Sequence, residues 1–164
     1  MSSITSEQFR NMKKRGRVNA NRSTNASGVK FDSDTERWFY EVLTLLGHEF
    51  QFQVKYVLIG PTIPKNKKVL LFTDRCAEAV TLTVDFVFEK DGITYIVDTK
   101  GDKKRAKVES RLKYDILKHR LAEQGLASKT RLLFVGTSEV LNMCKAAKVS
   151  ETLFWELFSK VKER

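Results

Sequence analysis

The chain contains few of the residues that bind zinc or form disulfide bonds. Its 164 residues include two cysteines and two histidines. Cys76 and Cys144 lack metal-ligand spacing, and His48 and His119 are too isolated to complete a zinc site. Two thiols without a disulfide framework are typical of a reducing compartment, so we expect a cytoplasmic protein.

Long apolar runs are also missing. No stretch approaches the roughly 18 residues of a transmembrane helix, and residues 1–6 do not resemble the apolar core of a signal peptide. No internal repeat is visible. The length and the hydrophobic fraction of 41% favour one domain with a substantial core.

Basic residues exceed acidic ones, and the formal net charge is +10. Such an excess indicates a polyanionic partner. Nucleic acid fits better than a membrane surface, because no basic amphipathic helix with a clean apolar face stands out. The simpler interpretation is a soluble protein that happens to be basic.

The N-terminal segment 1–27 is polar and basic, with little to bury. We predict a flexible arm here, followed by a single domain at 28–164. The arm either lies along phosphates or is a solvated tail. Its candidate DNA-binding residues are Lys13, Lys14, Arg15 and Arg17.

A β-hairpin is the strongest local prediction. Two β-rich runs flank Asp91-Gly92, a dipeptide typical of two-residue hairpin turns. This turn places Lys90 opposite Ile93 and Asp85 opposite Asp98. Side chains alternate with a period of two, so Asp98 and Lys100 share a face with Asp85.

Two opposed carboxylates repel each other, and something must offset that repulsion. A divalent cation such as Mg²⁺ is the simplest candidate, because it prefers hard oxygen ligands. Two alternatives stay open. A longer turn would keep Asp85 and Asp98 apart, or Lys100 would neutralise them in an ion-pair cluster.

The remaining patterns predict helices alternating with strands. Ser33 and Glu36 have the capping-box spacing at the start of the first helix, and Gly47 ends it. The other expected elements are strands at 50–58, 68–72, 80–89, 93–99 and 131–136, and helices from about 107 to 124, 138–147 and 150–162. The first of these later helices would bury Val108, Leu112, Ile116 or Leu117, and Leu121. This order predicts an α/β fold with a mixed sheet flanked by helices.

Asp85, followed thirteen residues later by Asp98-Thr99-Lys100, resembles the signature of the PD-(D/E)xK nuclease superfamily. Val84 stands where that signature often has proline. The resemblance implies a restriction-endonuclease-like αβββαβ core and metal-dependent phosphodiester hydrolysis.

A longer segment is similar to a small phage and prophage family of endonuclease-like proteins, some described as Holliday-junction resolvases. The similarity rests on Gly28-Val29-Lys30-Phe31-Asp32-Ser33 with Glu36, on Gln51 or Gln53, and on Asp85-Phe86 and Asp98-Thr99-Lys100-Gly101. It covers about 28–125. It implies a Mg²⁺-dependent endodeoxyribonuclease of branched DNA, with Mn²⁺ able to substitute, acting as a homodimer.

The resemblance also implies roles for individual residues. Asp85, Asp98 and the backbone carbonyl of Thr99 would bind the metal, because the Thr99 side chain is expected on the opposite face. Lys100 would orient water or stabilise the phosphate. Glu36 would add a metal or water contact, although the helix cap also explains it. Gln53 would support the site, with Gln51 as its competitor.

A second basic cluster follows the acidic strand. Its members are Lys103, Lys104, Arg105, Lys107, Arg111 and Lys113. They would grip phosphates next to the scissile bond, or else form an ordinary solvated helix face. Two other functions stay open: a restriction- or nicking-type endonuclease of the same fold, and a DNA-binding accessory protein without catalysis.

Overall fold

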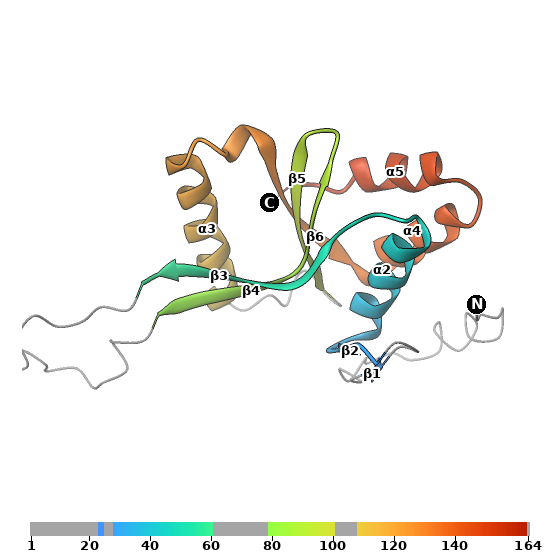
Figure 1. The fold of residues 1–164 in the computed structure, drawn as a ribbon, viewed down its shortest axis with the longest axis horizontal. Helices are drawn as coiled ribbons and strands as arrows, with labels where there is room; N and C mark the ends of the chain where they lie inside the picture. Colours follow the sequence, from blue (N-terminus) through green and yellow to red (C-terminus); the bar gives the residue numbers. More distant parts are fainter. Residues whose placement is uncertain (1–22, 25–27, 61–78, 101–107, 164) are drawn as a thin grey trace, which may run out of the picture.

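The computed structural model describes residues 23–24, 28–60, 79–100 and 108–163, and they form an α/β protein around a mixed four-stranded open sheet (Figure 1). The strands are β3 (Gln51–Ile59), β4 (Val80–Lys90), β5 (Ile93–Lys100) and β6 (Thr130–Gly136), in that spatial order. Strands β3, β4 and β5 are antiparallel neighbours. Strand β6 follows a helical crossover and is parallel to β5, as predicted.

Helices cover both faces of the sheet. Helices α2 (Asp34–Leu45), α4 (Thr137–Ala147) and α5 (Glu151–Ser159) pack on one face, which we call the α2 side. Helix α3 (Val108–Glu123) packs on the other face, the α3 side, and a short 3₁₀ helix, η4 (Ala127–Lys129), leads from it into β6. None of the helices in the described part of the chain is long and apolar enough to cross a membrane.

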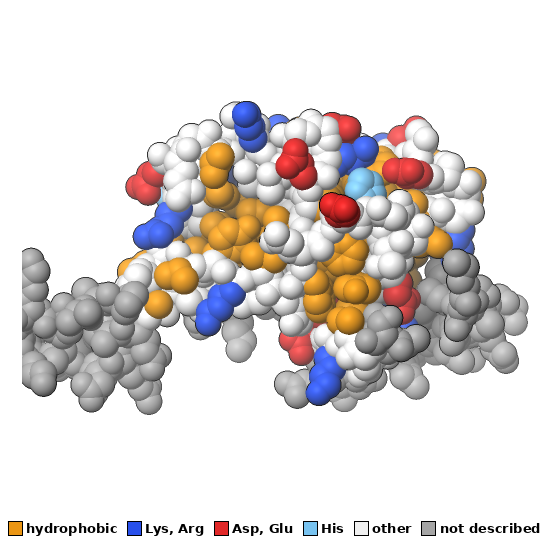
Figure 2. Space-filling view, in the orientation of Figure 1, with side chains coloured by type: hydrophobic (Ala, Val, Ile, Leu, Met, Phe, Trp, Pro, Cys, Tyr) orange, Lys and Arg blue, Asp and Glu red, His pale blue; other side chains and the backbone are white. Residues whose placement is uncertain are grey.

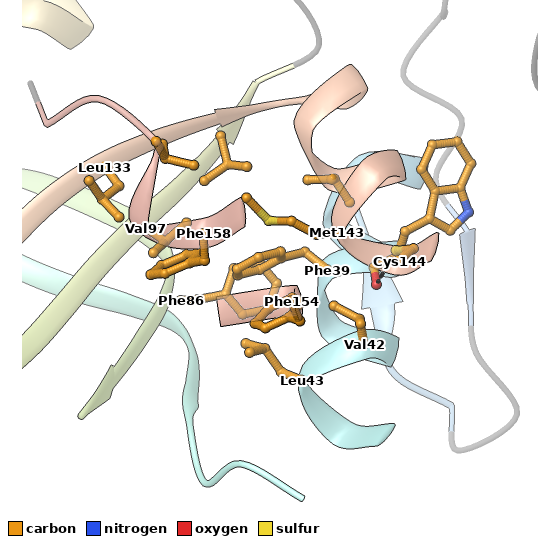
Figure 3. Packing of buried hydrophobic residues seen from close by; sticks show 14 of the residues in the cluster. Phe39, Val42, Leu43, Phe86, Val97, Leu133, Met143, Cys144, Phe154 and Phe158 are labelled. Atoms are coloured by element: carbon orange, nitrogen blue, oxygen red, sulfur yellow. Dashed lines mark hydrogen bonds between the residues drawn. The ribbon is translucent and has the colours of Figure 1, made fainter. Parts of the chain in front are cut away.

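Each face has its own hydrophobic core. On the α2 side, Phe39 and Phe154 are fully buried against Phe86 from β4 and Val97 from β5 (Figure 3). On the α3 side, Leu117 and its helix neighbours pack on residues of all four strands, including Ile96 of β5 and Leu132 of β6. Consecutive residues of β5 and β6 therefore enter different cores, as expected for a sheet that is covered on both sides.

The predicted hairpin turn is confirmed. Asp91 and Gly92 have φ values of 54° and 73°, the left-handed conformation that a type I′ turn requires at both central positions. The register pairs Lys90 with Ile93 and continues to Phe86 opposite Val97.

The predicted buried stripe of α3 is wrong at one position. Leu112 is 59% exposed, whereas Tyr114, Leu117 and Leu121 are buried. These three residues are spaced at i, i+3 and i+7, so they share a face that Leu112, two positions before Tyr114, does not. The aromatic ring of Tyr114 packs edge-on against Phe134 of β6, which fixes the rotation of the helix.

Two further predictions concern the N-terminal arm and the strand at 68–72. A short strand β1 (Ser23–Thr24), within the segment predicted as an arm, pairs with β2 (Lys30–Phe31). The predicted strand at 68–72 lies outside the described residues, as do residues 1–22 of the arm.

Candidate active site at a fork in the sheet

The predicted acidic residues lie where β4 and β5 separate. The two strands are paired from Lys90 opposite Ile93 up to Phe86 opposite Val97. Beyond that point, β4 continues beside β3, and β5 continues beside β6 as far as Lys100. Asp85 and Asp98 are the first residues past the last pair. They therefore flank a fork in the sheet.

The face alternation of β4 shifts at the same place. Leu82 and Val84 pack in the α3-side core, whereas Phe86 and Phe88 pack in the α2-side core. Residues two apart on a regular strand would share one face, so the alternation is interrupted at Asp85. The neighbouring strand β3 has a matching irregularity at Gln53, whose φ of 53° is in the left-handed region.

This shift changes the expected position of Asp85. Its Oδ2 accepts hydrogen bonds from the Thr99 backbone N–H at 2.6 Å and from the Thr99 hydroxyl at 2.7 Å. The expectation that the Thr99 side chain points away from Asp85 is therefore wrong. The Asp85 carboxylate takes the place of the backbone acceptor that β4 would have offered to β5 had the pairing continued.

Asp98 and Lys100 are brought together as predicted. Lys100 Nζ lies 2.7 Å from Asp98 Oδ2, and the Asp98 side chain is only 3% exposed. That oxygen nevertheless receives no hydrogen bond with suitable geometry from the described residues. The contact is thus an ion pair that leaves a buried carboxylate oxygen able to accept a further ligand.

The two aspartates influence each other electrostatically. The pKa of Asp85 is raised to about 7, first because the carboxyl group is buried and second because Asp98 carries a negative charge beside it. The hydrogen bonds from Thr99 act in the opposite direction. The interpretation in which the aspartates never meet is therefore not supported, and the Lys100 ion pair neutralises only part of their charge.

Glu36 is held from two directions on the α2 side. Its Oε2 accepts from the Asp32 backbone N–H at 2.7 Å, and its Oε1 accepts from Gln53 Nε2 at 3.3 Å. The Ser33 hydroxyl accepts a hydrogen bond from the Glu36 N–H, so the predicted helix cap is present. In a capping box the Glu36 carboxylate would accept from the Ser33 backbone N–H, but here it accepts from the Asp32 N–H instead. Of the two competing glutamines, Gln53 is the one that hydrogen-bonds to Glu36.

The surroundings of Glu36 favour its neutral form. Its side chain is buried, and burial raises its pKa, with a further contribution from the charge of Asp85. Both carboxylate oxygens already have hydrogen-bond partners. The structure therefore does not show Glu36 as a ligand in a common set with Asp85 and Asp98.

The metal prediction can be tested against the oxygen ligands present. In the described part of the chain, no three His, Cys, Asp or Glu side chains are grouped to hold a metal ion. Mg²⁺, however, is commonly bound by one or two carboxylates together with water and substrate phosphate. Asp85 and Asp98 meet that requirement, and the buried Asp98 Oδ2 has the right chemistry for a hard cation. The residues present therefore fit Mg²⁺ or Mn²⁺.

A contact between two threonine hydroxyls, which the sequence did not predict, joins two helices next to the site. Thr35 Oγ1 and Thr137 Oγ1 lie 2.9 Å apart, joining the first turns of α2 and α4. Thr35 precedes Glu36, and Thr137 follows Gly136, which pairs with Lys100. No local pattern could have identified this contact, because its partners are 102 residues apart.

Replacing Thr35 or Thr137 with valine should destabilise the protein by about 1–2 kcal/mol each, because the remaining hydroxyl loses its partner. The double valine variant should be destabilised by less than the sum, since neither hydroxyl is then left unpaired. Urea unfolding measures both effects. Thr44→Val is the control: its exposed hydroxyl bonds only to its own helix, so a change of no more than about 0.5 kcal/mol is expected. Strict additivity would contradict the proposed coupling.

The basic residues predicted to bind DNA are only partly described. Arg111 is exposed on α3, and Lys113 is half-buried on the same helix. The others lie outside the described residues: Lys13, Lys14, Arg15, Arg17, Lys103, Lys104, Arg105 and Lys107.

Comparison of the chain with protein-family models, with curated proteins and with solved structures gives no match.

Proposed function

We propose that this protein is a Mg²⁺-dependent endodeoxyribonuclease with a restriction-endonuclease-like αβββαβ core. The observation that carries the proposal is the meeting of Asp85, Asp98 and Lys100 at the fork between β4 and β5. The order α2, β3–β5, α3, β6 supports the fold assignment. Two neighbouring carboxylates beside a lysine form a combination suited to phosphodiester hydrolysis.

Each residue would have a distinct role. Asp85 and Asp98, with the carbonyl of Thr99, hold the metal, which supplies charge neutralisation and a more acidic water when bound. Lys100 is 35% exposed, so its ammonium can leave Asp98 to orient the attacking water or to stabilise the phosphate. Glu36 and Gln53 close the α2 side of the site and contribute a carboxyl group and an amide hydrogen-bond donor there.

Charge supports DNA as the substrate. The described residues contain 15 basic and 16 acidic side chains, so the excess of positive charge belongs entirely to the sequence of the remaining segments. Their basic residues are suited to phosphate contacts that position a duplex without reading its sequence. We favour branched DNA and a cytoplasmic setting. A two-fold homodimer follows from the paired cuts that resolving a Holliday junction requires.

Cleavage of a substrate panel tests the proposal. With Mg²⁺, the purified protein should cut a four-way junction symmetrically and faster than a duplex, flap or fork of matched sequence, and EDTA should stop the reaction. Equal cutting of linear duplex would instead favour a restriction- or nicking-type enzyme. Binding without cleavage of any substrate in Mg²⁺ or Mn²⁺ would indicate a non-catalytic accessory protein.

A further inference from the structure

The outer halves of β3 and β4 form a two-stranded ribbon. Beyond the fork, β4 has left β5 and pairs only with β3 among the described strands. The register places Lys55 opposite Thr83 and Val57 opposite Thr81. Figure 1 shows this ribbon extending away from β5 and β6 beneath α3.

The two faces of this ribbon differ sharply in exposure. On the α3 side, Leu58 is 1% exposed and Leu82 is 7% exposed, and both pack in the core beneath α3. On the other face, Val57 is 53% exposed and Ile59 is 45% exposed, although both are β-branched apolar residues. No described helix covers this second face, and the space-filling view shows hydrophobic side chains at the outer end of β3 (Figure 2).

The uncovered face leads to Asp85 and Thr99 at the fork. It lies on the α2 side of the sheet, where the Asp85 carboxylate meets the hydroxyl of Thr99. On β4, Thr83 is two residues before Asp85. On β3, Lys55 pairs with Thr83 and is two residues after Gln53. From Asp85 to Thr81 the strand covers roughly 13 Å at about 3.3 Å per residue. That is about the axial rise of four base pairs of duplex DNA.

The chemistry of this face suits a phosphate backbone. We call its residues the ribbon face: Lys55, Val57, Ile59, Thr81 and Thr83. Its single charge is positive, and its two hydroxyl groups are the kind of donor that commonly contacts phosphate oxygens. No carboxylate interrupts it before Asp85. A surface of this composition can lie close to a DNA strand without repelling it.

We propose that the ribbon face is the surface along which the DNA strand flanking the scissile phosphate lies, an inference that rests on the proposed nuclease function. Lys55 would pair with a phosphate near the cut. Thr81 and Thr83 would donate to its neighbours, and Val57 and Ile59 would pack against the sugars. The ribbon face would thereby set the direction in which the strand enters the fork.

Binding of Lys55→Ala to a fluorescent four-way junction provides the first test. Without divalent metal, so that no cleavage occurs, its affinity should fall about 3- to 10-fold, and the slope of log affinity against log salt should drop by about one. The matched control is Lys129→Ala. Lys129 is an exposed lysine that directly precedes β6, and it lies at the end of the β5–β6 pair opposite to Lys100. An unchanged slope in Lys55→Ala, or equal losses in both variants, would overturn the inference.

Photo-cross-linking provides the second test and uses two exposed valines. The photoreactive residue p-benzoylphenylalanine replaces Val57 on the ribbon face, or Val149, which is 77% exposed in the turn between α4 and α5. Irradiation with labelled junction should cross-link DNA at position 57 and not at position 149. A cross-link from position 57 to a second protein chain, or none to DNA, would overturn the inference.

The two proposals can fail separately. A cross-link at position 57 in a protein that cuts no substrate would uphold the ribbon face and reject the nuclease. Cleavage by a protein that shows neither the cross-link nor the salt effect would reject the ribbon face alone. Absence of any DNA binding would reject both.

Discussion

Asp98→Asn should lower cleavage of a four-way junction by about 10³-fold or more while leaving junction binding within about threefold of wild type. Asp98 is 3% exposed, and its Oδ2, which faces Lys100, receives no hydrogen bond from the described residues. Asparagine keeps the shape of the side chain but loses the negative charge that metal binding requires. Lys100→Ala should have a similar effect, because it removes the ammonium 2.7 Å from that oxygen.

Single-turnover cleavage in Mg²⁺ and fluorescence anisotropy in EDTA measure the two quantities separately. Glu89→Gln is the matched control, since it makes the same chemical change on an exposed residue of the same hairpin, opposite Thr94. It should cleave at the wild-type rate. Retained cleavage in Asp98→Asn, or an equal loss in Glu89→Gln, would show that the fork is not the catalytic centre.

Asp85→Asn should raise the thermal stability of the metal-free protein at pH 8, although it removes a functional group. The pKa of Asp85 is raised to about 7 by burial and by the charge of Asp98. A carboxyl group whose pKa is higher in the folded state favours folding while it is protonated. The contribution of Asp85 to the free energy of unfolding is full below the pKa of the unfolded state, near 4. It falls as the pH rises and is lost above about 7.

Asparagine is neutral at every pH and can still accept hydrogen bonds from Thr99. The variant should therefore be more stable than wild type at pH 8 by up to a few kcal/mol, and nearly equal to it at pH 4. For a chain of this length, each kcal/mol corresponds to about 2–4 °C in Tm. Differential scanning calorimetry at pH 4, 6 and 8 in EDTA measures the difference.

Adding Mg²⁺ or Mn²⁺ should reverse this order. A cation between Asp85 and Asp98 removes their repulsion, so Tm of the wild type should rise with metal at pH 8 and much less at pH 5, where Asp85 is protonated. Asp85→Asn should show little metal-dependent rise. A variant less stable than wild type at pH 8 without metal would mean that the charge of Asp85 stabilises the folded state and that its pKa is not raised.

Much of this architecture could be predicted from local sequence. Asp91-Gly92 defines the hairpin turn and register, because its two residues adopt the left-handed conformation that a two-residue turn needs. Ser33 marks the start of α2, because its hydroxyl accepts the N–H three residues later. The ion pair between Asp98 and Lys100 follows from the period of two along β5. Each depends on residues that are close together in the chain.

Other predictions failed because they depend on competition between distant segments. The ladder between β4 and β5 stops at Phe86 opposite Val97, since β4 stays with β3 and β5 stays with β6. Where β4 and β5 separate, the alternation of side chains between the two faces is interrupted at Asp85, and Gln53 has a positive φ. An extrapolated hairpin therefore placed the Asp85 carboxylate away from the Thr99 side chain, to which it is in fact hydrogen-bonded. The rotation of α3, which exposes Leu112, depends likewise on packing against the strands.

By itself, the sequence determined the turn, the helix cap and the order of strands and helices, because these follow from local backbone preferences and side-chain periodicity. It also predicted that Asp98 and Lys100 lie together, because they are two residues apart on one strand. Only the tertiary structure decided which hydrogen bonds these side chains form. Asp85 accepts from Thr99, Glu36 accepts from Asp32 and Gln53, and Thr35 contacts Thr137. These contacts depend on where strands part and where helix ends converge, which is set by packing between segments far apart in the chain.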